Sequence, residues 1–369
     1  MKRVLIILVA LFGATTALAA EQVYRGEQTL WQDTVWSGEV LVDGIVTVAP
    51  QVTLEVRPGT TVRFTRFDSN GDGIGEHELL AQGRLLIEGT PAEPVLFTSA
   101  EYQPRRGDWG ALNIMVSDGP ASRLEHVTVE YGYRGFHAHF SNAEIFSSTF
   151  RNNLRGVQFQ ESTMKLHDCR IEDNLNGIQF RDSKVELVGN WIHGNYWGLR
   201  CVYSDVLLVD NIVSDNLVNG LNLRDSQVVM ENNRVLANRR GIYLQRSQGQ
   251  VSGNLVEYSS EHGLYLEESQ VEVTGNAIRH NGRSGVKWIE SEGLLRGNDL
   301  SDNGTYALYN EGTSDVDARY NWWGGQLLQG ADPRIFDGRS REGLGMVDWA
   351  ESLPAEPEDT HSMSGSGER

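Results

Sequence analysis

The sequence predicts an all-β fold, a right-handed parallel β-helix, which is a solenoid of 21–22-residue coils with three short strands in each coil. Three residue ladders with this period indicate it, because repeats of this length bury their apolar faces by stacking on their neighbours. The glycine ladder comprises Gly135, Gly156, Gly177, Gly198, Gly220, Gly241, Gly263 and Gly285. The serine ladder comprises Ser141, Ser162, Ser183, Ser204, Ser226, Ser247, Ser269 and Ser291. The asparagine ladder comprises Asn153, Asn174, Asn195, Asn216, Asn238, Asn281 and Asn303, with Ser260 in its gap.

An apolar-polar-apolar triplet follows each glycine and predicts the first strand of a coil. Two apolar columns are expected to point inward, for example Ile178 with Phe180 in one coil and Leu221 with Leu223 in another. Alternation with period two is typical of a strand, whereas an amphipathic helix needs a period of about 3.6. The polar residues of the triplets are therefore expected to face outward.

A second strand is predicted after each serine, for example over Lys184–Val188, and a shorter third strand around residues such as Ile171 and Ile192. Leucine-rich repeats share the period, but their leucine–asparagine consensus is missing. Crossovers between parallel strands are nearly always right-handed. The asparagines are expected at bends where φ is positive, with hydrogen bonds from coil to coil. We therefore assign the three ladders to architecture and not to catalysis.

The N-terminal residues predict export. Lys2 and Arg3 precede an apolar run that is too short to cross a bilayer, and a small-x-small site ends at Ala19. Residues 1–19 are therefore predicted to be a signal peptide cleaved after Ala19, which places the protein in the periplasm or outside the cell.

The other boundaries follow from the ladders and from the segments that interrupt them. A solenoid exposes its core at both ends, so atypical terminal segments are expected to act as caps. The final residues are almost without apolar side chains, which indicates disorder. The predicted segments are an N-terminal cap with irregular opening coils at 20–110, including an Asp/Gly-rich hairpin at 68–78, the regular β-helix at 111–320, a C-terminal cap at 321–352 and a disordered tail at 353–369.

The composition excludes some partners. The chain carries 50 acidic and 32 basic residues, a formal net charge of −18. Such a surface disfavours nucleic acid and anionic membranes, and no membrane insertion is expected. Cys169 and Cys201 lie about one and a half coils apart, so we expect two free thiols, with Cys201 in the core.

One local motif suggests a metal. Residues 68–73 match D-x-[DN]-x-[DN]-G, the first half of a calcium-binding loop. A glycine at the sixth position allows the sharp turn that brings the oxygen ligands together, and the next residue offers its carbonyl. Position 12 is Leu79 where a glutamate is expected. A metal-free turn is the alternative. The candidate Ca²⁺ ligands are Asp68, Asn70, Asp72, Ile74 through its carbonyl, Glu76 and Glu78.

The outward side of the first strands is the second candidate site. Aromatic rings stack on sugar faces, and amide and guanidinium groups bind hydroxyls and carboxylates. The alternative is that these polar residues are simply solvated, as any β-helix requires. The candidate ligand-binding residues are Arg181, Arg200, Asn222, Arg224, Tyr243, Tyr265 and Lys287. No residue is assigned a catalytic role.

The coils, the Gly107-Asp108-Trp109-Gly110 segment and the closing Asn321-Trp322-Trp323-Gly324 resemble the large right-handed parallel β-helix repeat family of exported bacterial proteins, the pectate-lyase-like superfamily. The resemblance covers nearly the whole mature chain. It implies functions that range from pectate lyases, polygalacturonases and mannuronan epimerases to carbohydrate-binding surface proteins. The family also includes the periplasmic accessory protein of nitrous-oxide reductase maturation. Fold alone does not choose among these functions.

We therefore expect an exported, non-catalytic β-helix that binds polysaccharide or another envelope component along its first-strand face, with a calcium-stabilised loop. A polysaccharide lyase or epimerase is the first alternative, although the Asp-Pro-His-Asp signature that the resemblance implies for mannuronan epimerases is absent. A periplasmic accessory protein for metalloenzyme maturation is the second. The candidate copper ligands for that role are few, and such residues are more often incidental than ligands: His137, His139, His361 and Met363.

Overall fold

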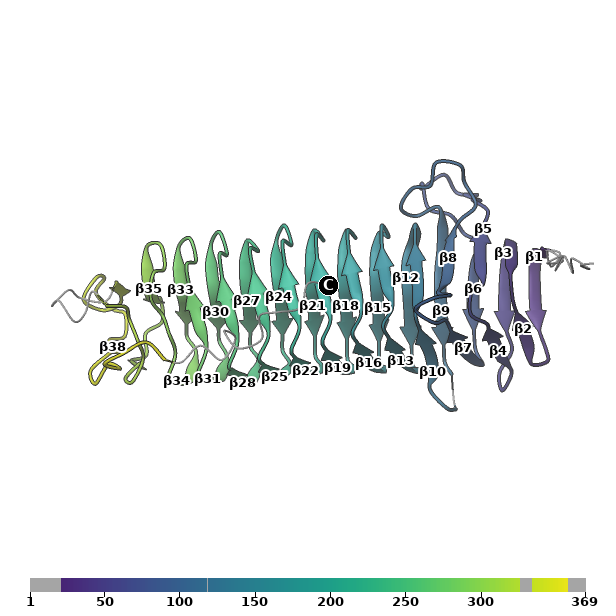
Figure 1. The fold of residues 1–369 in the computed structure, drawn as a ribbon. Coiled ribbons are helices and arrows are strands. Elements are labelled where there is room, and N and C mark those ends of the chain that lie inside the picture. The colour runs from purple at the N-terminus through teal and green to yellow at the C-terminus, as the bar shows by residue number, and fades with distance from the viewer. Residues whose placement is uncertain (1–20, 118, 326–333, 358–369) are drawn as a thin grey trace, which may run out of the picture.

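The chain folds into one long stack of β-coils. The computed structural model describes residues 21–117, 119–325 and 334–357, and this part of the chain contains strands and no helix. Figure 1 shows the coils stacked side by side, from β1 at one end to β38 at the other. No described segment is a helix long and apolar enough to span a membrane. The predicted signal peptide and most of the predicted tail lie outside the described residues.

Three strands per coil are confirmed, and every pairing among the described strands of the coils is parallel. The first strands of the regular coils are β12 (Gly132–His139), β15 (Arg155–Gln160), β18 (Asn176–Arg181), β21 (Trp197–Val202), β24 (Asn219–Arg224), β27 (Arg240–Gln245), β30 (His262–Glu267), β33 (Ser284–Ile289) and β35 (Tyr306–Asn310). The third strands are β11 (Val127–Glu130), β14 (Thr149–Arg151), β17 (Arg170–Glu172), β20 (Trp191–His193), β23 (Ile212–Ser214), β26 (Arg234–Leu236), β29 (Leu255–Glu257) and β32 (Ala277–Arg279).

The second strands form a separate sheet of 12 strands along the stack. They are β2 (Thr34–Trp36), β4 (Thr53–Val56), β7 (Arg84–Glu88), β10 (Ser122–Glu125), β13 (Asn142–Phe146), β16 (Thr163–His167), β19 (Lys184–Val188), β22 (Asp205–Val209), β25 (Gln227–Glu231), β28 (Gln248–Ser252), β31 (Gln270–Thr274) and β34 (Glu292–Arg296). The opening coils add β1 (Gln22–Leu30), β3 (Glu39–Val48), β5 (Thr61–Phe64), β6 (Glu78–Ala81), β8 (Val95–Ser99) and β9 (Trp109–Met115).

The core runs through the centre of the stack, and the predicted inward columns line it. Ile178 and Leu221 are fully buried, and Phe180 and Leu223 are buried with them. Both cysteines are free, as expected, and both are buried, although only Cys201 was expected in the core. Burial raises the pKa of each thiol to about 12, so neither is a reactive thiolate near neutral pH.

Hydrogen bonds run from coil to coil along the asparagine ladder, as predicted, and they also run along the serine ladder. Asn174 Nδ2 donates to Asn195 Oδ1 (3.1 Å) and to the Phe150 carbonyl (2.9 Å). The Ser162 backbone N–H donates to Ser183 Oγ at 3.1 Å. The buried amides satisfy one another, so the ladders hold neighbouring coils in register. The gap in the asparagine ladder is filled by Ser259 and not by Ser260, because the Ser259 N–H donates to Asn281 Oδ1 at 3.0 Å.

One predicted role is wrong. The ladder asparagines do not adopt positive φ; the residue before each of them does, as Asp173 (φ 52°) does before Asn174. The ladder glycines allow close approach between coils. A Cβ on Gly177 would lie 2.5 Å from the Gly198 carbonyl oxygen and 3.1 Å from Asn195 side-chain atoms. Glycine is needed there because the asparagine ladder packs directly against the strand.

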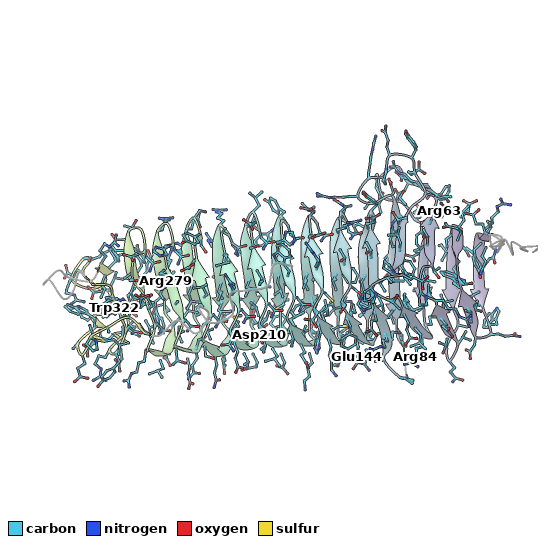
Figure 2. The ribbon with its side chains drawn as sticks, viewed as in Figure 1. Arg63, Arg84, Glu144, Asp210, Arg279 and Trp322 are labelled. Atoms are coloured by element: carbon cyan, nitrogen blue, oxygen red, sulfur yellow. The ribbon has the colours of Figure 1, made fainter. Side chains whose placement is uncertain are left out.

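The two ends of the stack differ. At the C-terminal end the chain leaves the regular rhythm, and β36 (Val316–Asp317), β37 (Ile335–Phe336) and β38 (Val347–Asp348) pack there with buried Trp322 and Trp323 (Figures 1 and 2). At the N-terminal end, residues from 21 onward already form coils.

The segment predicted as a hairpin at 68–78 is a long loop. Its flanking strands β5 and β6 both pair in parallel with β3, one after the other, so they are not the antiparallel arms of a hairpin. Figure 1 shows this loop standing out from the stack beside β5 and β8.

Candidate functional site

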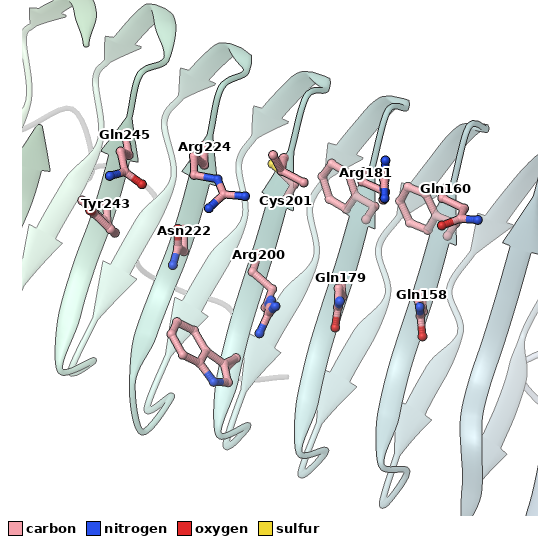
Figure 3. Close-up of a pocket in the computed structure, with 14 residues that line it drawn as sticks. Gln158, Gln160, Gln179, Arg181, Arg200, Cys201, Asn222, Arg224, Tyr243 and Gln245 are labelled. Atoms are coloured by element: carbon pink, nitrogen blue, oxygen red, sulfur yellow. The ribbon is translucent and has the colours of Figure 1, made fainter. Parts of the chain in front are cut away.

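A shallow groove lies on the outward side of the first strands, which we call the first-strand face. It has a volume of about 320 Å³ and extends over β15, β18, β21, β24 and β27 (Figure 3). The groove contains five of the seven predicted ligand-binding residues: Arg181, Arg200, Asn222, Arg224 and Tyr243. The other two, Tyr265 and Lys287, lie on the next two coils and outside it.

The parallel register places these side chains in columns. Gln158, Gln179, Arg200, Asn222 and Tyr243 are paired in succession from one coil to the next. Beneath them Phe159 and Phe180 stack in the buried layer, with ring centroids 4.8 Å apart. The groove therefore has a packed floor, and its polar groups are fixed on strands and not on flexible loops.

Most of the predicted cations are neutralised by a carboxylate. Arg181 pairs with Asp182 at 2.8 Å and Arg224 with Asp225 at 3.2 Å. Lys287 pairs with Glu311 at 3.1 Å. Arg200 is exposed, and within the described part of the chain it has no ion pair; its guanidinium lies 5.6 Å from the centroid of the Trp197 ring. Arg200 is the cation of the predicted set that is free to meet a ligand.

Two further arginines extend this charge toward the N-terminal end. Arg134 Nε and Arg155 Nη1 both donate to Gln158 Oε1, at 3.0 and 2.7 Å. Across the described residues neither arginine has an ion pair, and both lie over the Tyr133 ring. Burial lowers the pKa of Arg134, and the charge of Arg155 acts in the same direction. We call Arg134, Arg155 and Arg200 the cationic strip. Arg134 and Arg155 directly precede the ladder glycines Gly135 and Gly156 in the sequence, but the predicted set of ligand-binding residues omits both arginines.

A partly buried hydrogen-bond chain borders the cationic strip. Asn113 Nδ2 donates to Glu78 Oε2 (2.6 Å), and Asn113 Oδ1 contacts His137 Nδ1 (2.8 Å). Because Asn113 Oδ1 is an acceptor, His137 carries its proton on Nδ1 and keeps a free lone pair on Nε2. Burial, reinforced by Arg134, lowers the pKa of His137 to about 3. Burial raises the pKa of Glu78.

This arrangement separates Glu78 from the predicted calcium site. Glu78 begins β6, so its side chain belongs to the sheet and is held by Asn113. Gly110 leaves room for it, since a Cβ there would lie 3.0 Å from Glu78 Oε2.

The rest of the predicted calcium loop is held by its own hydrogen bonds. Asp68 accepts the backbone N–H groups of Gly71 and Gly73 (2.8 and 2.9 Å). Asn70, Asp72 and Glu76 likewise accept N–H groups within the loop. Arg66 Nη2 lies 3.8 Å from Asp68 Oδ2. No group of three or more His, Cys, Asp or Glu side chains placed to hold a metal ion occurs in the described residues.

The candidate copper ligands have other partners. His137 bonds Asn113, and His139 Nε2 contacts Glu161 Oε2 at 2.7 Å. His361 and Met363 lie outside the described residues. The described residues therefore offer no copper site that would favour the accessory-protein alternative.

Aromatic rings continue the face beyond the groove. The Tyr243 and Tyr265 rings are 4.6 Å apart, and Lys287 Nζ lies 4.8 Å from the Tyr265 centroid and 5.5 Å from that of Tyr309. Tyr309 stacks on Phe336 at 4.4 Å. Burial raises the pKa of Tyr243, and its hydroxyl donates to Glu267 Oε2 at 2.5 Å. The first-strand face thus passes from cationic to aromatic along the stack.

Comparison with known proteins identifies the repeats. The family described as "Right handed beta helix region" matches residues 105–213, 134–270 and 203–323, and the "Pectate-lyase like beta helix domain" matches residues 28–136. A search of curated proteins finds no significant match.

Solved structures share the fold at low sequence identity. A point mutant of the periplasmic alginate epimerase AlgG superposes with a TM-score of 0.57 at 14% identity, over 85% of this chain and 77% of that chain. The A-module of the Azotobacter vinelandii mannuronan C-5 epimerase AlgE4 has a TM-score of 0.38 at 15% identity, over 77% of this chain and 85% of that chain. Tailspike protein 3 of bacteriophage CBA120 has a TM-score of 0.37 at 11% identity, over 91% of this chain and 57% of that chain. At 14% identity the match to the AlgG mutant establishes the fold alone.

Proposed function

This chain belongs to the right-handed β-helix family, and we propose that it is a non-catalytic binding protein for an acidic polysaccharide, which lies along the first-strand face. The observation that carries the proposal is the cationic strip. Arg134, Arg155 and Arg200 make no ion pair among the described residues, although the chain has a net charge of −18; Glu78 attracts Arg134 only from beyond ion-pair distance. In such a chain, unpaired arginines gathered on one face favour an anionic ligand.

The spacing of the strip suits a polymer. Arg134 and Arg155 lie on neighbouring coils, and Arg200 lies two coils further on. At about 4.8 Å per coil the strip extends over roughly 14 Å, so several acidic units of one chain can bind at once. Trp197 and the aromatic rings that follow offer faces on which sugar rings stack.

A binding panel tests the proposal. Calorimetry with polyuronates such as pectate and alginate, and with neutral dextran of similar length, should detect binding of the polyuronates alone. The affinity should fall as salt is added, because exposed charges are screened. Equal binding of dextran, or no binding of any acidic glycan, would overturn the proposal. We also propose export with cleavage after Ala19, which the mass of the mature protein from the periplasm or medium checks.

A polysaccharide lyase or epimerase remains the second candidate, and the Glu78–Asn113–His137 chain is the observation that favours it. The free Nε2 lone pair of His137 lies on the same face as Arg134, so a base and a carboxylate-binding cation are adjacent. With a pKa of about 3, His137 stays unprotonated throughout the mildly acidic range.

Turnover and its pH profile distinguish the two candidates. A lyase gives ultraviolet absorbance of unsaturated uronate, and an epimerase exchanges the C-5 proton with deuterated water. If His137 is the base, the rate should stay level from neutral pH down to about pH 4, where an ordinary histidine near 6.5 would lose activity. His137→Ala should abolish the lyase or epimerase activity. If polyuronates bind but neither the lyase nor the epimerase reaction occurs, this candidate is ruled out.

For the protruding loop we propose that Ca²⁺ draws together a reduced set of ligands, Asp68, Asn70, Asp72, the Ile74 carbonyl and Glu76, whose acidic side chains are not grouped around one point in this structure. Each carboxylate oxygen in the loop that accepts an N–H keeps a second lone pair for a cation. Millimolar Ca²⁺ should raise the melting temperature by about 3 °C. Asp72→Asn, which keeps the size of the side chain, should reduce the shift. Unchanged melting together with no heat in a calcium titration would contradict the proposal.

A further inference from the structure

The first coil leaves one edge of a long strand without a partner. β1 pairs with β3 along nine residues, and no other described strand pairs with it. Figure 1 shows β1 as the last described strand at this end of the stack. Unpaired N–H and C=O groups in a strand of this length are a template for pairing with another chain.

The core is also less covered at this end. Tyr24, Gln28 and Leu30 face inward in β1 and are half-buried. Their partners in the next coil, Val42, Val46 and Val48, are fully buried. Close by, Trp31 is 76% exposed. By contrast, the C-terminal end is closed by its irregular segment, where Trp323 is 6% exposed.

The charges of β1 complement those of a second, antiparallel β1. Its outward residues Arg25 and Glu27 flank Gly26. A two-fold axis through Gly26 would set Arg25 of one copy opposite Glu27 of the other, twice. Arg25 is available, since its side chain is 78% exposed and its nearest acid, Asp43, is 4.0 Å away. Gly26 adopts φ 66°, and a Cβ there would meet no described atom within 4 Å, so no side chain of the same copy occupies the position of the axis.

The same register brings the inward side chains together. Tyr24 would face Gln28 of the second copy, and Gln22 would face Leu30. The half-buried end of each core would then be covered by the other, and antiparallel pairing would satisfy the free strand edge. We propose that the chain forms a head-to-head dimer in which β1 pairs antiparallel with β1 of a second copy about an axis through Gly26.

Charge reversal tests this register directly. Light scattering on the exported protein should give twice the chain mass at high micromolar concentration. Arg25→Glu and Glu27→Arg should each weaken the dimer at least about tenfold, because two attractive pairs become repulsive. The double variant Arg25→Glu/Glu27→Arg should restore it, since opposite charges face each other again.

The alternatives give different outcomes. A monomer at every concentration, or single variants as dimeric as the wild type, overturns the proposal. As a second measurement, Val23→Cys/Thr29→Cys should form an intermolecular disulfide on mild oxidation, because these positions face each other in this register. The native cysteines are buried and should not interfere. Failure of this disulfide to form in a dimeric preparation rejects the register.

Discussion

Gly177→Ala should destabilise the middle of the solenoid by about 3 kcal/mol, an estimate from the cost of overpacking combined with a disrupted buried hydrogen bond. The new Cβ would be 2.5 Å from the Gly198 carbonyl oxygen and 3.1 Å from Asn195 side-chain atoms. Neither neighbour can yield easily, because the first is backbone and the second is bonded to Asn216. Strand β18 must therefore move away from the next coil.

Urea unfolding followed by circular dichroism and tryptophan fluorescence measures this loss. Because each coil contacts its neighbours alone, the transition should also broaden or split into two steps. Gly325→Ala is the matched control: a Cβ there meets no atom of the described residues within 4 Å, and the free energy of unfolding should change by less than about 0.5 kcal/mol. Similar losses in both variants would mean that the ladder glycines are not required for close approach.

The repeat made much of the fold predictable. Parallel pairing at a fixed period fixes which residues share a column, so Ile178 and Phe180 could be assigned to the core from spacing alone. A second buried asparagine ladder was missed: Asn190, Asn211, Asn233, Asn254, Asn276, Asn298 and Asn321. It also has the coil period, but it begins at Cys169, whose N–H donates to Asn190 Oδ1 at 2.9 Å. A ladder headed by a different residue type is harder to recognise.

The site was less predictable because contacts outside the repeat decide it. The neutralisation of Arg181 and Arg224 could have been anticipated, since an aspartate follows each in sequence. The role of Glu78 could not. The opening coils carry no ladder to set their register, and pairing between β9 and β12 shifts at a bulge between Arg134 and Phe136. The approach of Glu78 to Asn113 and His137 depends on that irregular register.

Removing two charges of the cationic strip should have the largest effect on binding. Arg155→Gln/Arg200→Gln should weaken binding of a polyuronate about 100-fold, because hydrogen bonds to charged groups contribute about 1.5–3 kcal/mol each. Calorimetry at one fixed salt concentration measures the change. Glutamine keeps a polar side chain on the strand, and both positions lie on the outside of the coil. The melting temperature should therefore stay close to that of the wild type.

Arg181→Gln/Arg224→Gln is the matched control, with the same change in net charge on the same face. These arginines already bind Asp182 and Asp225, so a ligand carboxylate would have to displace those partners. Their loss should weaken binding less than about threefold. If both double variants lose affinity equally, the ligand responds to overall charge and the strip is not a defined site. If neither does, the polysaccharide binds elsewhere. A selective loss in the first variant can arise only where unpaired arginines contact the ligand directly.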